Sequence, residues 1–215
     1  AMYFASRGMI AISAEYRIKS KHGTTPFESI EDAKSAIRFV RKNSKSYSIN
    51  NQRIAAAGGS AGGHLAASTA NVKGFDNSNE NLQVSSKPNA LVLYNPVLDT
   101  GPDSWGYNSF LRRMDGKMTI NPIEGSPFHG ISKDSPPTII LTGTNDKIVS
   151  VEMISRYKKK MESFNIRCDV IFYDGAEHSF FNKGQDFIDT LLKSDLFLKS
   201  NWYLEGNPTV KKQYQ

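Results

Sequence analysis

The chemistry that this chain could perform centres on one serine. Ser60 stands in the stretch GGSAG, residues 58–62, within the longer run AAAGGSAGGHLAA. The pattern Gly-x-Ser-x-Gly is typical of a nucleophile held on a strand-to-helix turn. A flexible linker is also rich in glycine and serine, so the flanking segments must decide between the two interpretations.

Those flanking segments favour the turn. Residues 53–57 predict a short strand and residues 61–70 a helix. At such a turn the positions two before and two after the serine, Gly58 and Gly62, are expected to crowd each other, so that only small residues fit. Because the helix begins at the serine, its free N–H groups face the site, and the N–H of Ala61 is expected to bind an oxyanion.

A serine hydroxyl needs a base, and four histidines are candidates. His178 follows the last predicted strand, and open α/β sheets bind ligands at the carboxyl ends of their strands, so we predict that His178 is the base. His22 lies in a lysine-rich loop and is expected to be solvated. His64 is expected to pack on the helix after Ser60, and His129 to have a structural role, although it could line a pocket.

The imidazole also needs a carboxylate that orients it. Asp146 comes directly after the predicted strand at 138–142 and therefore leaves the same sheet edge. The rivals are Glu177, which is adjacent to His178 and would struggle to reach back to its Nδ1 atom, and Asp174, which could hold the loop instead. We predict that Asp146 is the acid.

Short apolar strands alternate with helical patterns along the chain, which predicts an α/β fold with a mostly parallel sheet in a three-layer sandwich. One helix opens at Thr25, where Pro26 and Glu28 complete a capping box. The further predicted strands are residues 9–16, 90–94 and 167–173, and the further helices are residues 151–164 and 187–198. Residues 101–135 are expected to form an irregular excursion or lid, and residues 201–215 a polar tail that is not helical.

Composition excludes several classes of protein. The 215 residues are 39% hydrophobic, which suits a single domain spanning residues 1–215. The net charge of +6 comes from short, scattered groups of lysine and arginine that are expected to lie on solvated helix faces. We therefore expect no nucleic-acid partner. No apolar run is long enough for a membrane span, and no signal peptide is visible, which predicts a cytoplasmic protein while leaving export open. The single cysteine, Cys168, is expected to be buried and inert, and neither a metal nor a cofactor is implied.

The segments AISAEYRI, FESIEDAKSAIRFVRKN, RIAAAGGSAGGHLAA, TGTNDKIV and GAEHSF together resemble the α/β-hydrolase esterase/lipase family, and within it bacterial carboxylesterases and acetyl-esterase-like enzymes. The resemblance runs from about residue 7 to residue 198. It implies that Ser60 is the nucleophile, Asp146 the acid, His178 the base and Ala61 an amide donor, in the chain order of that fold. Asp32 and Arg53 match structural positions of the family.

One departure from the family pattern concerns the second oxyanion donor. Members normally carry a His-Gly-Gly-Gly-like loop after their third strand, and this sequence has none. We therefore expect a fold truncated at its N-terminus, in which the strand at 9–16 moves to pair with the strand at 53–57, or a second copy covers the exposed surface in a homodimer. Gly59, a neighbouring amide or the partner chain could supply the missing donor.

The predicted activity is two-step hydrolysis of a small-molecule ester of short acyl or carbohydrate acetyl type. Tyr94, Trp105, Tyr107 and Phe128 are candidates for the substrate pocket, although core packing explains such residues equally well. Two alternatives remain open: an oligopeptidase-type serine hydrolase, and a catalytically impaired relic of the fold whose sheet surface mediates association.

Overall fold

The computed structural model describes residues 1–115 and 119–214. Its sheet consists of β1 (Ala55–Gly59), β2 (Ala90–Tyr94), β3 (Thr138–Gly143) and β4 (Cys168–Tyr173). The strands lie in the order β1-β2-β3-β4, and each neighbouring pair is parallel. The four strands predicted at 53–57, 90–94, 138–142 and 167–173 are therefore confirmed, with β2 at the predicted bounds.

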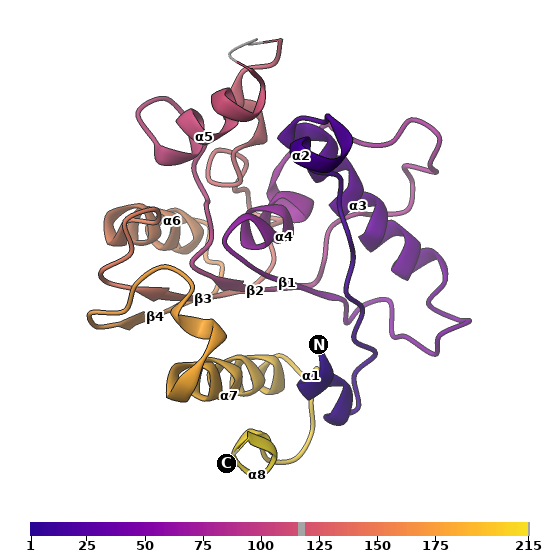
Figure 1. Cartoon of the computed structure of the whole chain (residues 1–215). Coiled ribbons are helices and arrows are strands. Elements are labelled where there is room, and N and C mark those ends of the chain that lie inside the picture. The colour runs from indigo at the N-terminus through magenta and orange to yellow at the C-terminus, as the bar shows by residue number, and fades with distance from the viewer. Residues whose placement is uncertain (116–118, 215) are drawn as a thin grey trace.

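Helices cover both faces of this sheet (Figure 1). One face carries α3 (Pro26–Lys42), α4 (Ala61–Asn71), α5 (Trp105–Arg113) and α6 (Val151–Ser163). The other carries α1 (Met2–Ser6), α7 (Gly184–Ser200) and α8 (Val210–Tyr214). Three short helical segments complete the described chain: α2 (Lys19–His22), η1 (Pro122–Gly125) and η2 (Phe180–Asn182). The predicted three-layer α/β architecture is confirmed.

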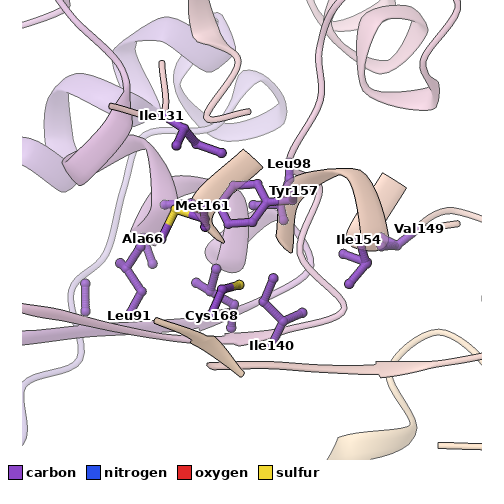
Figure 2. Close-up of a cluster of buried hydrophobic side chains, with 13 residues drawn as sticks. Ala66, Leu91, Leu98, Ile131, Ile140, Val149, Ile154, Tyr157, Met161 and Cys168 are labelled. Atoms are coloured by element: carbon purple, nitrogen blue, oxygen red, sulfur yellow. The ribbon is translucent and has the colours of Figure 1, made fainter. Parts of the chain in front are cut away.

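The two central strands, β2 and β3, are buried on both faces, as is typical of parallel strands between layers of helices. In β2 the side chains of Leu91 and Leu93 belong to the core under α4 and α6, whereas Ala90 and Val92 belong to the core against α7. Figure 2 shows the first of these clusters, with Tyr157 and other α6 side chains above the strands. Both layers of helices are thus held by alternate residues of the same strands.

Cys168 lies in the core under α6 and is 5% exposed, so its predicted burial is confirmed. Burial raises the pKa of the Cys168 thiol to about 12, and nearby Lys158 lowers it only in part. A thiol that stays protonated at neutral pH is a poor nucleophile.

The start of α3 forms as the sequence predicts. The Thr25 hydroxyl accepts a hydrogen bond from the Phe27 amide, and the Thr25 amide donates to the Glu28 carboxylate. Asp32 accepts hydrogen bonds from the amide and the side chain of Arg17, which ties α3 to the segment before it. The structural role expected of Asp32 is consistent with these contacts.

The strand predicted at residues 9–16 is wrong, and so is its pairing with residues 53–57. The segment runs irregularly past the outer edge of β1 (Figure 1), with Ile10 58% and Ile12 53% exposed. Within the described residues β1 has β2 on one side and no strand on the other. An apolar run becomes a strand only where a neighbour accepts its backbone hydrogen bonds. Association with a second copy through this edge stays a prediction.

Two regions expected to be irregular contain helices. The excursion at 101–135 includes α5 and η1, while its residues 116–118 lie outside the described part of the chain. The tail predicted not to be helical contains α8, whose Val210 is fully buried beside Tyr3 and Ile188. Tertiary burial rather than sequence periodicity accounts for this short helix. Among the described residues we find no helix with the length and apolarity required to cross a bilayer.

Candidate active site

Ser60 occupies the turn between β1 and α4. Its backbone has φ of 53° and ψ of −118°, a conformation that residues other than glycine rarely adopt. Its amide donates to the Tyr94 carbonyl of β2 at 2.9 Å, and its carbonyl accepts from the His64 amide of α4 at 3.0 Å. The strained residue is therefore held between the sheet and the helix. This is the strand-turn-helix context that the Gly-x-Ser-x-Gly pattern requires.

The predicted crowding between Gly58 and Gly62 is confirmed for Gly58 only. A Cβ atom on Gly58 would lie 2.3 Å from the backbone carbonyl of Gly62, so Gly58 must lack a side chain. A Cβ atom on Gly62 would meet nothing within 4 Å, so the expectation that Gly62 must also be small is wrong. A second constraint acts on Gly59, where a Cβ atom would lie 2.4 Å from the ring of Phe181.

A chain of hydrogen bonds connects the three residues predicted to act together. The Nε2 atom of His178 lies 2.8 Å from the Oγ atom of Ser60, and its Nδ1 atom lies 2.8 Å from Oδ2 of Asp146. Because the Asp146 carboxylate only accepts, Nδ1 carries the proton and Nε2 is left to accept the serine proton. The three side chains follow β1, β4 and β3, which all end at the same edge of the sheet.

The loops after β3 and β4 are bound to each other, which sets the distance between Asp146 and His178. The Asn145 amide donates to the Ala176 carbonyl at 3.0 Å. The Thr144 hydroxyl donates to Asp174 and accepts from the Gly175 amide. Asp174 therefore holds the loop, in agreement with the alternative role that its position in the sequence suggests.

Asp146 is buried and accepts four hydrogen bonds. Its Oδ1 atom accepts from the amides of Ile148 at 2.8 Å and Val149 at 3.0 Å, and its Oδ2 atom accepts from His178 and from Asn95. Burial raises the pKa of Asp146, but these hydrogen bonds, led by that from His178, outweigh it and hold the pKa below the ordinary value. The carboxylate is consequently ionised at neutral pH and can stabilise a positive imidazole.

Ala61 begins α4 directly after Ser60, so its amide is among the first N–H groups of the helix, which have no partner within that helix. These groups and the positive end of the helix dipole lie beside the serine. Gly59 is the last residue of β1 and pairs with Tyr94 in the sheet register. Its role as a second donor stays a prediction.

The other histidines lie in different environments. His64 is 4% exposed, and its Nδ1 atom donates to the Val97 carbonyl at 2.9 Å, which confirms its packing role. Burial lowers the pKa of His64 to about 4. His129 lies 3.2 Å from Asp99, and His22 is exposed, with its Nδ1 atom accepting from the Ile18 amide.

The four candidate pocket residues make contacts of their own. Tyr94 bonds its hydroxyl to Ser194 of α7 at 2.7 Å, and its ring lies 5.2 Å from that of Phe181. Phe128 packs against the core and lies under Arg156 and Lys160 of α6. Trp105 and Tyr107 lie in α5, where Trp105 is 39% exposed under Arg112. These contacts explain Tyr94 and Phe128 by packing.

Three features of the site escape sequence reasoning. Asn95 contacts Asp146 from the end of β2, and Phe181 packs on Gly59 from the loop after His178. An open groove of about 780 Å³ also lies beside His178, lined by residues of the segment 176–186 with several polar side chains. Only the Phe-Phe pair that follows His178 in the sequence hints at an aromatic wall. Within the described residues, no group of three or more His, Cys, Asp or Glu side chains has an arrangement that could hold a metal ion.

Comparisons with known proteins agree with this architecture. The BD-FAE family model matches residues 1–102, and the dienelactone hydrolase family model matches residues 124–196. The apo structure of esterase 2 from Thermogutta terrifontis superposes with a TM-score of 0.88 at 37% identity, over 96% of this chain and 77% of that one. The fold and the turn at Ser60 define an α/β-hydrolase. The chain belongs to the α/β-hydrolase esterase family.

Two curated relatives are longer proteins. The chain is 30% identical to endo-1,4-beta-xylanase B of Butyrivibrio fibrisolvens over 71% of its own length and 24% of that protein. It is 25% identical to an acetylxylan esterase of Xylanibacter ruminicola over 96% of its own length and 41% of that protein. The chain thus spans less than half the length of these relatives.

Proposed function

We propose that this chain is a serine carboxylesterase that hydrolyses short-acyl esters, acetyl esters of carbohydrates among them. The observation that carries the proposal is the continuous hydrogen-bond chain from Ser60 through His178 to Asp146, with 2.8 Å at each step. Structures of the related Thermogutta esterase carry organophosphorus groups, among them one phosphoramylated by tabun, at 36% identity to this chain. Such reagents react with activated hydroxyl nucleophiles, which supports the same role for Ser60.

The proposed reaction assigns each residue of the hydrogen-bond chain a role. His178 takes the proton of Ser60 through Nε2 while the serine oxygen attacks the ester carbonyl carbon. His178 then returns that proton to the departing alcohol, leaving an acyl group on Ser60. Water, deprotonated by the same imidazole, attacks the acyl carbonyl carbon, and the bond to Ser60 then breaks as the imidazolium returns the proton to Oγ, which releases the acid and restores the free serine. Asp146 keeps the proton on Nδ1 throughout and stabilises the imidazolium that forms in each half.

The carbonyl oxygen becomes negative during both attacks, and the start of α4 is where that charge is stabilised. The amide of Ala61 supplies one hydrogen bond, and the helix dipole adds a favourable field. One such donor is typically worth about 10²–10³ in turnover, so the rate depends strongly on whether a second amide also reaches the oxygen.

The acyl and alcohol parts of the substrate are suggested by the relatives. The Thermogutta esterase has been determined with propionate bound, at 36% identity to this chain, and the Xylanibacter relative is named an acetylxylan esterase. The groove beside His178 carries Glu177, Asn182, Lys183 and Asp186, which are suited to the hydroxyl groups of a sugar. Because His178 protonates the alcohol, that groove is where we place the leaving group.

A fluorophosphonate probe tests the proposal directly. The unsubstituted chain should be labelled and should hydrolyse p-nitrophenyl acetate, and Ser60→Ala should abolish both. Ser48 is the matched control, because it has the same φ of 53° in an exposed loop, so Ser48→Ala should leave labelling intact. An unlabelled parent chain would favour the impaired relic, and turnover of peptide anilides in preference to esters would favour the oligopeptidase.

A further inference from the structure

Asn95 is the first residue after β2, the strand between the one that ends at Ser60 and the one that leads to Asp146. Its side chain is fully buried, and its backbone is left-handed with φ of 41°. Its amide N–H donates to the Leu141 carbonyl of β3 at 2.9 Å, which fixes the residue relative to the strand that carries Asp146.

The side chain of Asn95 donates from Nδ2 to Oδ2 of Asp146 at 2.5 Å. This is the same carboxylate oxygen that accepts from Nδ1 of His178. A carboxylate only accepts, so the nitrogen of the amide group must face it. Asn95 and His178 therefore share one oxygen, while two backbone amides hold the other.

The remaining atom of the Asn95 side chain shows what orients it. Oδ1 is buried and has no hydrogen-bond partner within the described residues. Buried polar atoms are nearly always paired, so an unpaired oxygen indicates that the contact with Asp146, rather than a network around the amide, fixes this orientation.

We propose that Asn95 is a positioning residue that aligns Asp146 with His178 and limits how strongly the carboxylate draws the Nδ1 proton. The proposal rests on the esterase function proposed above. Asn95 acts only through Asp146. The other charged side chains of the two loops are Lys147, Asp174 and Glu177, and Asp174 is bound to Thr144. Within the described residues the hydrogen bonds to Asp146 come from none of these three, so Asn95 is the neighbour to vary.

Two substitutions keep the left-handed backbone, which glycine and aspartate both tolerate. Asn95→Gly removes the amide and should lower kcat roughly tenfold, the equivalent of one hydrogen bond to a charged group, while KM stays within about twofold. Asn95→Asp places a second carboxylate beside Asp146. Two buried carboxyl groups at this distance cannot both ionise, so the pair shares one proton and the kcat profile of the variant should depend on pH differently from that of the parent.

Asn165→Gly is the matched control, because Asn165 also has a positive φ, of 58°, at an exposed position after α6. It should change neither kcat nor the pH profile. A second readout does not depend on turnover: the low-field proton NMR resonance of the His178 Nδ1–H group should shift in both Asn95 variants and not in the control.

The outcomes are separable. Superimposable pH profiles for the parent and Asn95→Asp, or an unmoved Nδ1 proton in Asn95→Gly, would overturn the positioning role. A loss of kcat that matches the loss of folded protein, measured by circular dichroism, would also count against it. If the parent chain neither labels nor turns over ester, the esterase proposal fails, and the NMR comparison then decides the Asn95 contact alone.

Discussion

The backbone of Gly62 lies so close to Gly58 that a methyl group on Gly58 would stand 2.3 Å from the Gly62 carbonyl. The contact is one-sided, since a methyl group on Gly62 would meet nothing within 4 Å. It brings the end of β1 against the first turn of α4 and so fixes the direction in which Ser60 leaves the sheet. Two glycines that look equivalent in the sequence therefore have different tolerances.

This asymmetry predicts opposite results for two additions of one methyl group. Gly58→Ala should destabilise the fold by about 1–3 kcal/mol, the usual cost of overpacking a close contact. Gly62→Ala should leave the free energy of unfolding within about 1 kcal/mol of the parent, because alanine suits a helix better than glycine. Urea denaturation of both variants measures the difference. Equal destabilisation of the two would contradict the one-sided contact.

The contact between Gly59 and Phe181 predicts an energetic coupling. A Cβ atom on Gly59 would lie 2.4 Å from the Phe181 ring, so Gly59→Ala must displace that ring. Removing the ring by Phe181→Ala should relieve the clash, so the double variant should be more stable than the sum of the single changes by about 0.5–3 kcal/mol. A double-mutant cycle of unfolding free energies gives this number. Strictly additive changes would mean that the ring moves aside without cost.

Buried His64 predicts a pH-dependent loss of stability. Its pKa is lowered to about 4 by burial, so the unfolded chain binds one more proton than the folded chain between the ordinary value of 6.5 and about 4. The stability associated with neutral His64 is complete above pH 6.5 and is lost as the pH falls through this window, by roughly 3 kcal/mol in total.

His64→Gln lacks this titration. Its free energy of unfolding should fall less steeply than that of the parent between pH 6.5 and 4, in denaturation series run at matched ionic strength. His22→Gln is the control, since His22 is exposed, and it should follow the parent curve. A parent and a His64 variant with the same slope would show that His64 titrates normally in the fold.

The elements that local pattern determines agree with the structure. The apolar run of β2 and the capping box at Thr25 depend on neighbouring residues alone, and both form as predicted. The turn at Ser60 is equally local, because Gly58 lacks a side chain and so lets the first turn of α4 approach the end of β1 closely. The prediction that Asp146 and His178 act together also needed one topological rule, namely that neighbouring parallel strands end at a common edge of the sheet.

Elements that depend on a distant neighbour could not be predicted from local sequence pattern. Residues 9–16 have the composition of a strand but have no strand beside them in the described chain. The short helix α8 forms where Val210 is buried beside Tyr3, at the opposite end of the sequence.

The sequence alone thus determined the four strands of the sheet, although it also suggested a fifth at residues 9–16, and it determined the three side chains that follow β1, β3 and β4. Only the tertiary structure decided that Asn95 shares an oxygen of Asp146 with His178, across 51 residues of chain. The physical reason is range: propensity, capping and turn strain act within a few residues, whereas hydrogen bonds between loops are set by which strands lie side by side and how their ends align.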